Sequence, residues 1–203
     1  MENNSVKRPL KAVESKETKP TLQRPSEKET AKPTVTKSKN PLISDDCLKM
    51  LNYRIEQEDY SSRVYLAMSM WLDDKGYMNA SKLWRKYSDE ERTHADLARQ
   101  YLLDLGLRPL TAMLNQPVQE FSGFPQIIKD TYEHEVVITN QCKELASHAL
   151  KLGDHMLYQL AGTYLKEQIE ELGKAQNLVD QLESFGDDKI AMRLLDHELK
   201  DYL

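Results

Sequence analysis

The sequence predicts an all-α protein: a four-helix bundle with one long crossover between the second and third helices, followed by a short fifth helix. Three observations predict it. Beyond Pro41, long stretches of the chain lack both glycine and proline, apolar residues recur within them at helical spacing, and the breaks between them are short except for one. Such a pattern favours two helical hairpins joined by one long connection.

Composition divides the chain into an extension, residues 1–42, and a bundle domain, residues 43–203. The first 40 residues contain ten Lys or Arg and five Glu, a net charge of +5, whereas the whole chain carries −5, so the remainder carries −10. The extension is rich in Lys, Pro, Thr and Ser, has no aromatic residue and has apolar residues only singly. We therefore expect it to be disordered and basic.

Several classes of protein are disfavoured by what the chain lacks. No apolar run approaches the roughly 18 residues that span a bilayer, and no apolar segment follows the N-terminal charges as it would in a signal peptide. The five glutamates of the extension argue against a transit peptide. Cys47 and Cys142 form neither a disulfide framework nor a zinc-binding spacing. We therefore expect a cytoplasmic protein with free thiols and no membrane contact.

The first two helices have recognisable start and stop signals. The first is predicted to begin at Ser44, a good N-cap that is followed by two aspartates suited to the positive end of the helix dipole, and to end near Gly76. The second is predicted to begin at Tyr77 or Met78 and to end at Leu105, where a glycine and then a proline follow. Each helix is therefore about seven turns long.

The remaining helices follow a long connection from Leu107 to about Ser122, which contains two prolines and is long enough to cross the bundle from end to end. A third helix is predicted from about Pro125 to Leu152. A fourth should follow Gly153-Asp154 and run to about Ser184. A short fifth helix should follow Gly186-Asp187-Asp188. Its apolar side is expected to carry Ile190, Leu194, Leu195 and Leu199.

Acidic side chains fall on the buried stripes of the first two helices. Leu51, Glu58 and Tyr65 are spaced by seven residues and so lie nearly in line, which turns Glu58 toward the core. On the second helix, Glu91 and His94 lie on the apolar stripe. Their spacing of three residues directs both side chains toward one point.

The third and fourth helices repeat this pattern. Glu135 lies seven residues before Cys142 in an inward row of the third helix. On the fourth helix, Glu167 and Glu171 flank the buried edge, and Glu170 lies near them. Every long helix therefore contributes at least one acid to the interior.

Ionised carboxylates in a bundle core would each cost several kcal/mol unless they were protonated, paired or bound to cations. A cluster of carboxylate oxygens with a single imidazole suits iron or manganese better than structural zinc, which prefers cysteine and histidine. One glutamate from each of two helices together with a Glu-x-x-His motif is the ligand pattern of di-iron carboxylate bundles. The sequence therefore predicts a dinuclear metal site.

From Ile43 to Leu203 the chain resembles the non-haem, bacterial-type ferritins, which belong to the ferritin-like di-iron carboxylate family. The matching segments are specific as a group, although each alone is short. They are Glu58-Asp59-Tyr60-Ser61-Ser62 with Tyr65, Glu90-Glu91-Arg92-Thr93-His94, Tyr132-Glu133-His134-Glu135, and Glu167-Gln168-Ile169-Glu170-Glu171.

The resemblance implies a ferritin-like bundle and a set of iron ligands. Glu58, Glu91 and His94 would hold one iron ion, and Glu91 would bridge to a second ion. Glu135 and Glu171 would complete the site of that second ion.

The resemblance also implies roles around this centre. Tyr65 and Gln168 would line it as catalytic residues, although packing in the core is the other reading of Tyr65. Bacterial members often have a third, outer iron position, and Glu90, Glu167 and Glu170 match its ligands. The other four histidines of the chain are expected on the surface. They are His134, His148, His155 and His197.

The chain departs from the family pattern in specific places. The second Glu-x-x-His of haem-binding bacterioferritins and rubrerythrins is missing, because Glu170 stands three residues after Glu167 and Lys174 stands three residues after Glu171. No haem is therefore expected. Thr163 stands where bacterial relatives often carry an aromatic residue, and the basic extension is also outside the usual pattern.

The resemblance implies ferroxidase activity and iron storage. Carboxylate ligands stabilise Fe(III) over Fe(II), and two adjacent ferrous ions can pass electrons together to dioxygen or peroxide. The ferric product would be mineralised inside a homo-oligomeric shell of about twenty-four subunits.

Two other functions stay open. A di-iron enzyme acting on an organic substrate would need an apolar pocket beside the metals. A scaffold protein would use its basic extension to recruit a partner, which the sequence does not identify. Nucleic acid is an improbable partner, because the extension has no aromatic residue and a low charge density.

Overall fold

The computed structural model describes residues 42–202, and every helix predicted from the sequence is present in it. The extension predicted for residues 1–42 lies outside the described residues, except for Leu42. Among residues 42–202 no helix has both the length and the apolar character needed to cross a membrane. The elements are α1 (Asp45–Asp74), α2 (Met78–Asp104), α3 (Phe124–Lys151), α4 (His155–Phe185), α5 (Lys189–Glu198) and the 3-10 helix η1 (Leu199–Tyr202).

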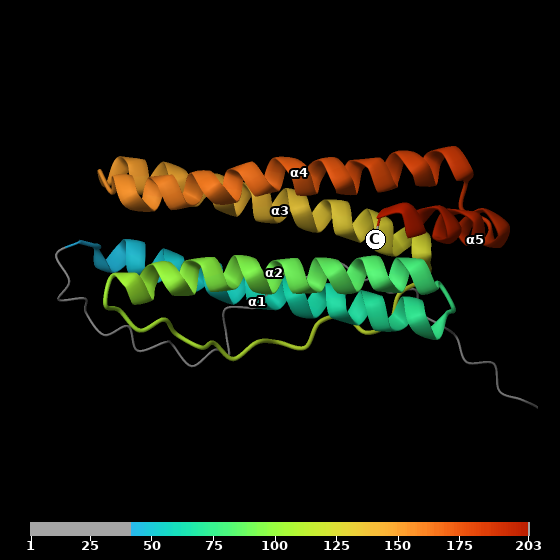
Figure 1. The fold of residues 1–203 in the computed structure, drawn as a ribbon, viewed down its shortest axis with the longest axis horizontal. Coiled ribbons are helices and arrows are strands. Elements are labelled where there is room, and N and C mark those ends of the chain that lie inside the picture. The colour runs from blue at the N-terminus through green and yellow to red at the C-terminus, as the bar shows by residue number, and fades with distance from the viewer. Residues whose placement is uncertain (1–41, 203) are drawn as a thin grey trace, which may run out of the picture.

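The four long helices form two antiparallel hairpins, α1 with α2 and α3 with α4 (Figure 1). The crossover between α2 and α3 runs back along the outside of the first hairpin, so that α2 and α3 point in the same direction. The Asn52 side chain holds the crossover against α1, because its Oδ1 accepts a hydrogen bond from the backbone N–H of Leu110 at 2.7 Å. This connectivity confirms the predicted fold class.

Local sequence signals set the helix ends. Ser44 caps α1 through its Oγ, which accepts a hydrogen bond from the third residue of the helix at 3.1 Å. Asp154 and Asp188 cap α4 and α5 in the same way. After α2 the chain reverses at Gly106, whose φ of +72° is a conformation that glycine adopts without strain. The helix boundaries therefore fall within about two residues of those predicted.

The core consists of two apolar clusters separated by a polar layer. The first cluster joins the second half of α1 to α5 and includes Tyr65 and Trp84, while the second joins the first half of α1 to the start of α4 and includes Leu51 and Tyr164. Both cysteines are free, as predicted, and both are buried. The buried polar residues between the two clusters include Arg54, Glu58, Glu91, Glu135 and Gln168.

The rotation of α5 differs from the prediction. Leu195 and Leu199 are buried as expected, but Ile190 is 74% exposed and Leu194 is 54% exposed. The reason lies in Asp196, whose carboxylate accepts hydrogen bonds from two backbone N–H groups in the first turn of α2, at 2.8 and 3.1 Å. This contact turns the face containing Leu195 toward the bundle and leaves Ile190 and Leu194 outside.

Candidate metal centre

Five predicted ligands come together in the polar layer, between the two hairpins. Helix α1 contributes Glu58, α2 contributes Glu91 and His94, α3 contributes Glu135, and α4 contributes Glu171. Glu58, Glu91 and Glu135 are buried, whereas His94 and Glu171 are partly exposed. The helical spacing that predicted inward-facing acids therefore corresponds to side chains that meet in space.

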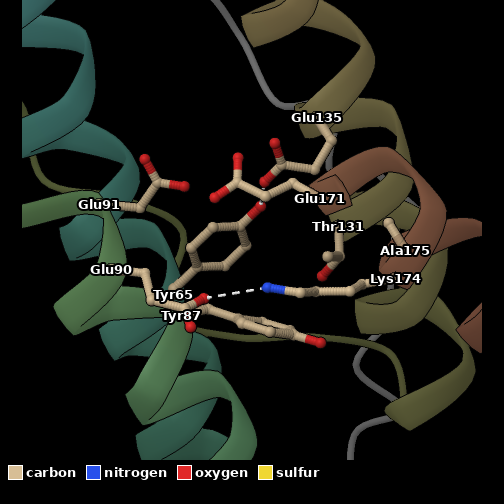
Figure 2. Close-up of a pocket in the computed structure, with 9 residues that line it drawn as sticks. All are labelled: Tyr65, Tyr87, Glu90, Glu91, Thr131, Glu135, Glu171, Lys174 and Ala175. Carbon is tan, nitrogen blue, oxygen red and sulfur yellow. Dashed lines mark hydrogen bonds and ion pairs between the residues drawn. The ribbon is translucent and has the colours of Figure 1, made fainter. Parts of the chain in front are cut away.

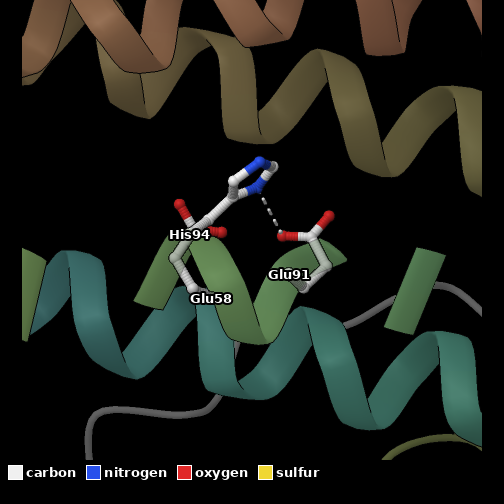
Figure 3. Close-up of side chains that lie close together, drawn as sticks. All are labelled: Glu58, Glu91 and His94. Atoms are coloured by element: carbon white, nitrogen blue, oxygen red, sulfur yellow. Dashed lines mark ion pairs between the residues drawn. The ribbon is translucent and has the colours of Figure 1, made fainter. Parts of the chain in front are cut away.

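Three of these residues, Glu58, Glu91 and His94, form the first triad (Figure 3). One ligand atom from each lies within 4.8 Å of the others. The imidazole Nδ1 of His94 is 3.6 Å from Glu91 Oε2. The hydroxyl group of Tyr164 donates a hydrogen bond of 2.7 Å to the backbone carbonyl of His94, which ties this turn of α2 to α4.

Glu91 also belongs to a second triad with Glu135 and Glu171, whose ligand atoms again lie within 4.8 Å of one another. Figure 2 shows these three carboxylates facing each other across the gap between the hairpins. His94 lies beside both triads, because its Nε2 is 3.7 Å from Glu171 Oε1. Two cation positions that share Glu91 are therefore available.

The second triad is oriented by neutral hydrogen-bond donors. The Tyr65 hydroxyl group donates to Glu135 Oε1, and the Gln168 amide donates to Glu135 Oε2 at 2.8 Å. Tyr65 and Gln168 are both buried. The two residues expected to line the centre thus hold one carboxylate in place through both of its oxygens.

The first triad is oriented by a cation that sequence reasoning missed. Arg54 is only 2% exposed, and its Nε lies 2.8 Å from Glu58 Oε1. Its Nη1 donates a hydrogen bond of 2.9 Å to Gln141 on α3. The signal was present in the sequence, because Arg54 stands four residues before Glu58 and so lies on the same helical face.

Burial raises the pKa of every carboxyl group in the second triad. It raises the pKa of Glu135 to about 7, although the hydrogen bond from Tyr65 opposes the rise. Burial and then the nearby carboxylates raise the pKa of Glu171 to about 9 and that of Glu91 well above its usual range. Near neutral pH, and without a cation, this triad therefore holds protons that a metal ion would displace.

The donor set fits a divalent metal ion. One oxygen in each of Glu58, Glu91 and Glu171, the Oε2 atom, is buried and has no hydrogen-bond partner within residues 42–202. Buried polar atoms without partners are rare and costly, and a cation held between these oxygens would satisfy them. Carboxylates with one imidazole are suitable ligands for Fe(II). Both triads are therefore candidate iron positions.

The residues predicted for a third iron position lie outside the two triads. Glu90 and Glu167 are partly exposed and Glu170 is exposed. None of them belongs to either triad. Glu90 Oε2 lies instead 3.8 Å from the ammonium group of Lys174, an ion pair drawn in Figure 2. The third position therefore stays a prediction.

The expectation that His134 lies on the surface is wrong. Its ring is buried, with Nε2 2.8 Å from the Ser61 hydroxyl group and its edge against Tyr65. Burial and then the charge of Arg54 lower its pKa to about 4, so it is neutral at pH 7. The small Ser61 side chain of α1 makes room for the ring. His155 and His197 are exposed, as expected.

A small cavity adjoins the second triad (Figure 2). Its volume is about 10 Å³, and its walls include Tyr65, Tyr87, Thr131 and Lys174 beside the carboxylates. A cavity of this size holds about one water molecule. It is therefore too small for an organic substrate.

Comparisons with known proteins identify the family of this chain. The family described as the ferritin-like domain matches residues 48–185. A probable bacterial non-heme ferritin-like protein of Haemophilus influenzae is 30% identical over 158 residues, which cover 78% of this chain and 96% of the relative. A bacterial non-heme ferritin of Escherichia coli is 29% identical over 158 residues, with the same coverage of each chain.

Solved structures lead to the same family. The structure of a novel open pore ferritin from the hyperthermophilic archaeon Archaeoglobus fulgidus matches with a TM-score of 0.75 and 32% identity, covering 78% of this chain and 96% of that one. A structure described as a humanized archaeal ferritin matches with a TM-score of 0.74 and 32% identity, covering 77% of this chain and 95% of that one. The chain therefore belongs to the ferritin-like family, and its resemblance to the non-haem bacterial ferritins is confirmed.

Proposed function

We propose that this protein is a ferroxidase that stores iron. The observation that carries the proposal is the pair of triads sharing Glu91, which offers two adjacent positions for Fe(II) inside a bundle of the ferritin-like family. Iron is the substrate here, and the residues Glu58, Glu91, His94, Glu135 and Glu171 bind it.

The ligands favour oxidation of bound Fe(II). Anionic carboxylate oxygens stabilise Fe(III) more than Fe(II), so they lower the cost of removing an electron. Two ferrous ions held side by side can supply two electrons together, which dioxygen or peroxide accepts along with protons. The carboxyl groups of Glu135 and Glu171 release protons when the metal binds, because their raised pKa values mean that they hold protons beforehand.

The cavity beside the second triad supports a small oxidant. Its volume of about 10 Å³ is close to the minimum for one water molecule, and an organic substrate would need far more room. Ferroxidase activity is therefore favoured over a di-iron enzyme that modifies an organic molecule. Tyr65, whose hydroxyl group contacts Glu135, lines this cavity beside the ligands and is part of the proposed catalytic machinery, together with Gln168.

Storage requires assembly, and we extend the proposal to a cytoplasmic homo-oligomeric shell of about twenty-four subunits that encloses the ferric mineral. Membership of the ferritin-like family supports it. Glu90, Glu167 and Glu170 would form the third, outer iron position. The extension of residues 1–40 is proposed to be dispensable for oxidation, so that a chain shortened before Pro41 should oxidise iron at the same rate.

Oxygen consumption after addition of Fe(II) tests the proposal. The wild-type protein should oxidise Fe(II) much faster than buffer and then retain the iron in a large, electron-dense particle. Glu91→Gln should abolish the acceleration because it removes the shared ligand, whereas Glu133→Gln, an exposed position on α3, should leave it unchanged. A correctly folded wild-type protein that oxidises Fe(II) no faster than buffer would refute the proposal.

Particle mass measured together with the iron-to-subunit ratio separates storage from simple oxidation. A shell with many iron ions per subunit is expected. Oxidation without mineral, in a particle the size of a dimer, would favour the enzyme acting on an organic substrate.

A further inference from the structure

A route from solvent to the second triad runs between α2 and α4. The cavity beside that triad has buried walls that include Tyr65, Glu91 and Glu135. The lining residues that reach solvent come from α2 and α4, and Lys174 on α4 is the most exposed of those described. An ion that approaches the triad through this cavity must therefore pass Lys174.

The Lys174 side chain extends across this route toward α2 (Figure 2). Its ammonium group lies 3.8 Å from Oε2 of Glu90, so that an ion pair joins the two helices beside the cavity. Lys174 makes no second ion pair within residues 42–202. The two side chains are 46% and 31% exposed, and an exposed ion pair is worth at most about fivefold in an equilibrium constant. The contact can therefore open readily.

The charge of Lys174 acts differently on the ion and on the oxidant. The ammonium group repels a divalent cation that approaches the cavity, whereas dioxygen and hydrogen peroxide are neutral and experience no such repulsion. When the ion pair opens, the ammonium group can turn into solvent, and the Glu90 carboxylate is free to attract the cation. A bound ion that leaves by this route must pass the same point, so Lys174 opposes movement in both directions.

We propose that Lys174 is a gate for cations: paired with Glu90, it slows the passage of Fe(II) between solvent and the second triad, and opening of the ion pair lets the ion through. The inference rests on the proposed function, since it assumes that the second triad binds Fe(II). Lys174 is not a ligand in this scheme. A gate that acts in both directions changes the rates of binding and release and leaves the affinity nearly unchanged.

Stopped-flow binding of Co(II) to the full-length protein at low salt tests the gate. Co(II) is a divalent probe whose visible absorption reports binding without any oxidation step. Glu135→Gln identifies the signal of the second triad, because that signal should be missing from this variant. Lys174→Gln should accelerate binding at the second triad by up to about fivefold, and release to an excess of chelator by a similar factor. Wild-type rates in Lys174→Gln would overturn the inference.

Further variants separate the charge of Lys174 from its size. Lys174→Arg keeps the cation and should keep the wild-type rates. Lys143→Gln removes a cation from an exposed position on α3 that does not line the cavity, and it should change nothing. The ratio of the Lys174→Gln rate to the wild-type rate should fall toward one as salt rises from about 0.01 M to about 1 M, because salt screens exposed charges. A ratio that is independent of salt would overturn the inference.

The outcomes for the inference and for the proposed function are distinguishable. Binding of Co(II) at the second triad with equal rates in Lys174→Gln and the wild type contradicts only the gate. A higher affinity in Lys174→Gln with slower release would mean that Lys174 repels the bound ion, which also contradicts only the gate. Absence of the second-triad signal from the wild-type protein contradicts the proposed function as well.

Discussion

The first and second triads share Glu91, but their other carboxylates are held by different kinds of contact. In the second triad, Tyr65 and Gln168 orient Glu135 through neutral hydrogen bonds that leave its charge intact. In the first, Arg54 orients Glu58 by neutralising it. The difference shows that two neighbouring groups of ligands can lie in unequal electrostatic environments.

The same comparison has consequences for stability. Glu58 contacts its countercharge in the folded protein, whereas burial raises the pKa of each carboxyl group in the second triad, so that these groups hold protons instead. Removing the Glu58 carboxylate should therefore destabilise the metal-free protein. Removing a carboxyl group of the second triad should instead relieve the cost of burying it.

The largest expected effect is on oxidation. Glu135→Gln removes a ligand of the second triad and should slow Fe(II) oxidation by about 100-fold or more, because the two-ion centre can no longer form. Stopped-flow absorbance of the ferric product measures it. Anaerobic titration should find one tightly bound Fe(II) fewer per subunit. A normal rate with Glu135→Gln would show that the second triad is not where oxidation occurs.

Glu58→Ala should lower the free energy of unfolding by about 3 kcal/mol or more, because it leaves the Arg54 charge buried and unpaired. Urea denaturation of the metal-free protein measures the change. The double variant Arg54→Met with Glu58→Met is the matched comparison, since it removes both charges and should recover most of the loss. If the single variant is as stable as the wild type, the ion pair does not hold Glu58 in place.

The stability of the metal-free protein should fall as the pH rises from 7 to 9. Glu171 has a pKa of about 9 in the folded chain and 4.5 as a free side chain, so the folded state holds more protons than the unfolded state across this window. Each extra proton lowers the free energy of unfolding by about 1.4 kcal/mol per pH unit. Below about pH 6.5 the lowered pKa of His134 opposes the trend.

Glu171→Gln provides the control for this pH dependence. It removes the titrating group, so the slope between pH 7 and 9 should decrease by up to one proton. Saturating Co(II) should also flatten the slope, because the metal keeps the carboxylates ionised in the folded state. A slope unaffected by both changes would mean that protons do not reside on this triad.

Most of the fold was predictable, because helical periodicity indicates which side chains of a helix face the core. Periodicity also turned Glu58, Glu91, His94 and Glu135 inward, whereas the choice of Glu171 over Glu167 on the fourth helix came from the family resemblance. What the sequence did not reveal depends on how one helix is rotated against another. Arg54 stands four residues before Glu58 on the same helix, which was a signal in the sequence, but its second partner, Gln141, lies on α3. His134 is buried because Ser61 stands opposite it, on a different helix.

The orientation of α5 shows the same limit. The sequence marks α5 as amphipathic, but its apolar residues Ile190 and Leu194 are exposed while Leu195 is buried. The choice between these faces is made by Asp196, which binds the first turn of α2. Contacts between residues more than a hundred positions apart, such as this one, leave no periodic signal in the sequence.

The smallest expected effect concerns the hydroxyl group of Tyr65. Tyr65→Phe removes one hydrogen bond to Glu135 and should lower the free energy of unfolding by about 1 kcal/mol, since the ring still fills the core. The binding of two Fe(II) ions should persist. Oxidation separates the two readings of this residue: an unchanged rate identifies Tyr65 as a packing and orienting group, whereas a slower rate with both Fe(II) ions bound shows that its hydroxyl group takes part in the reaction.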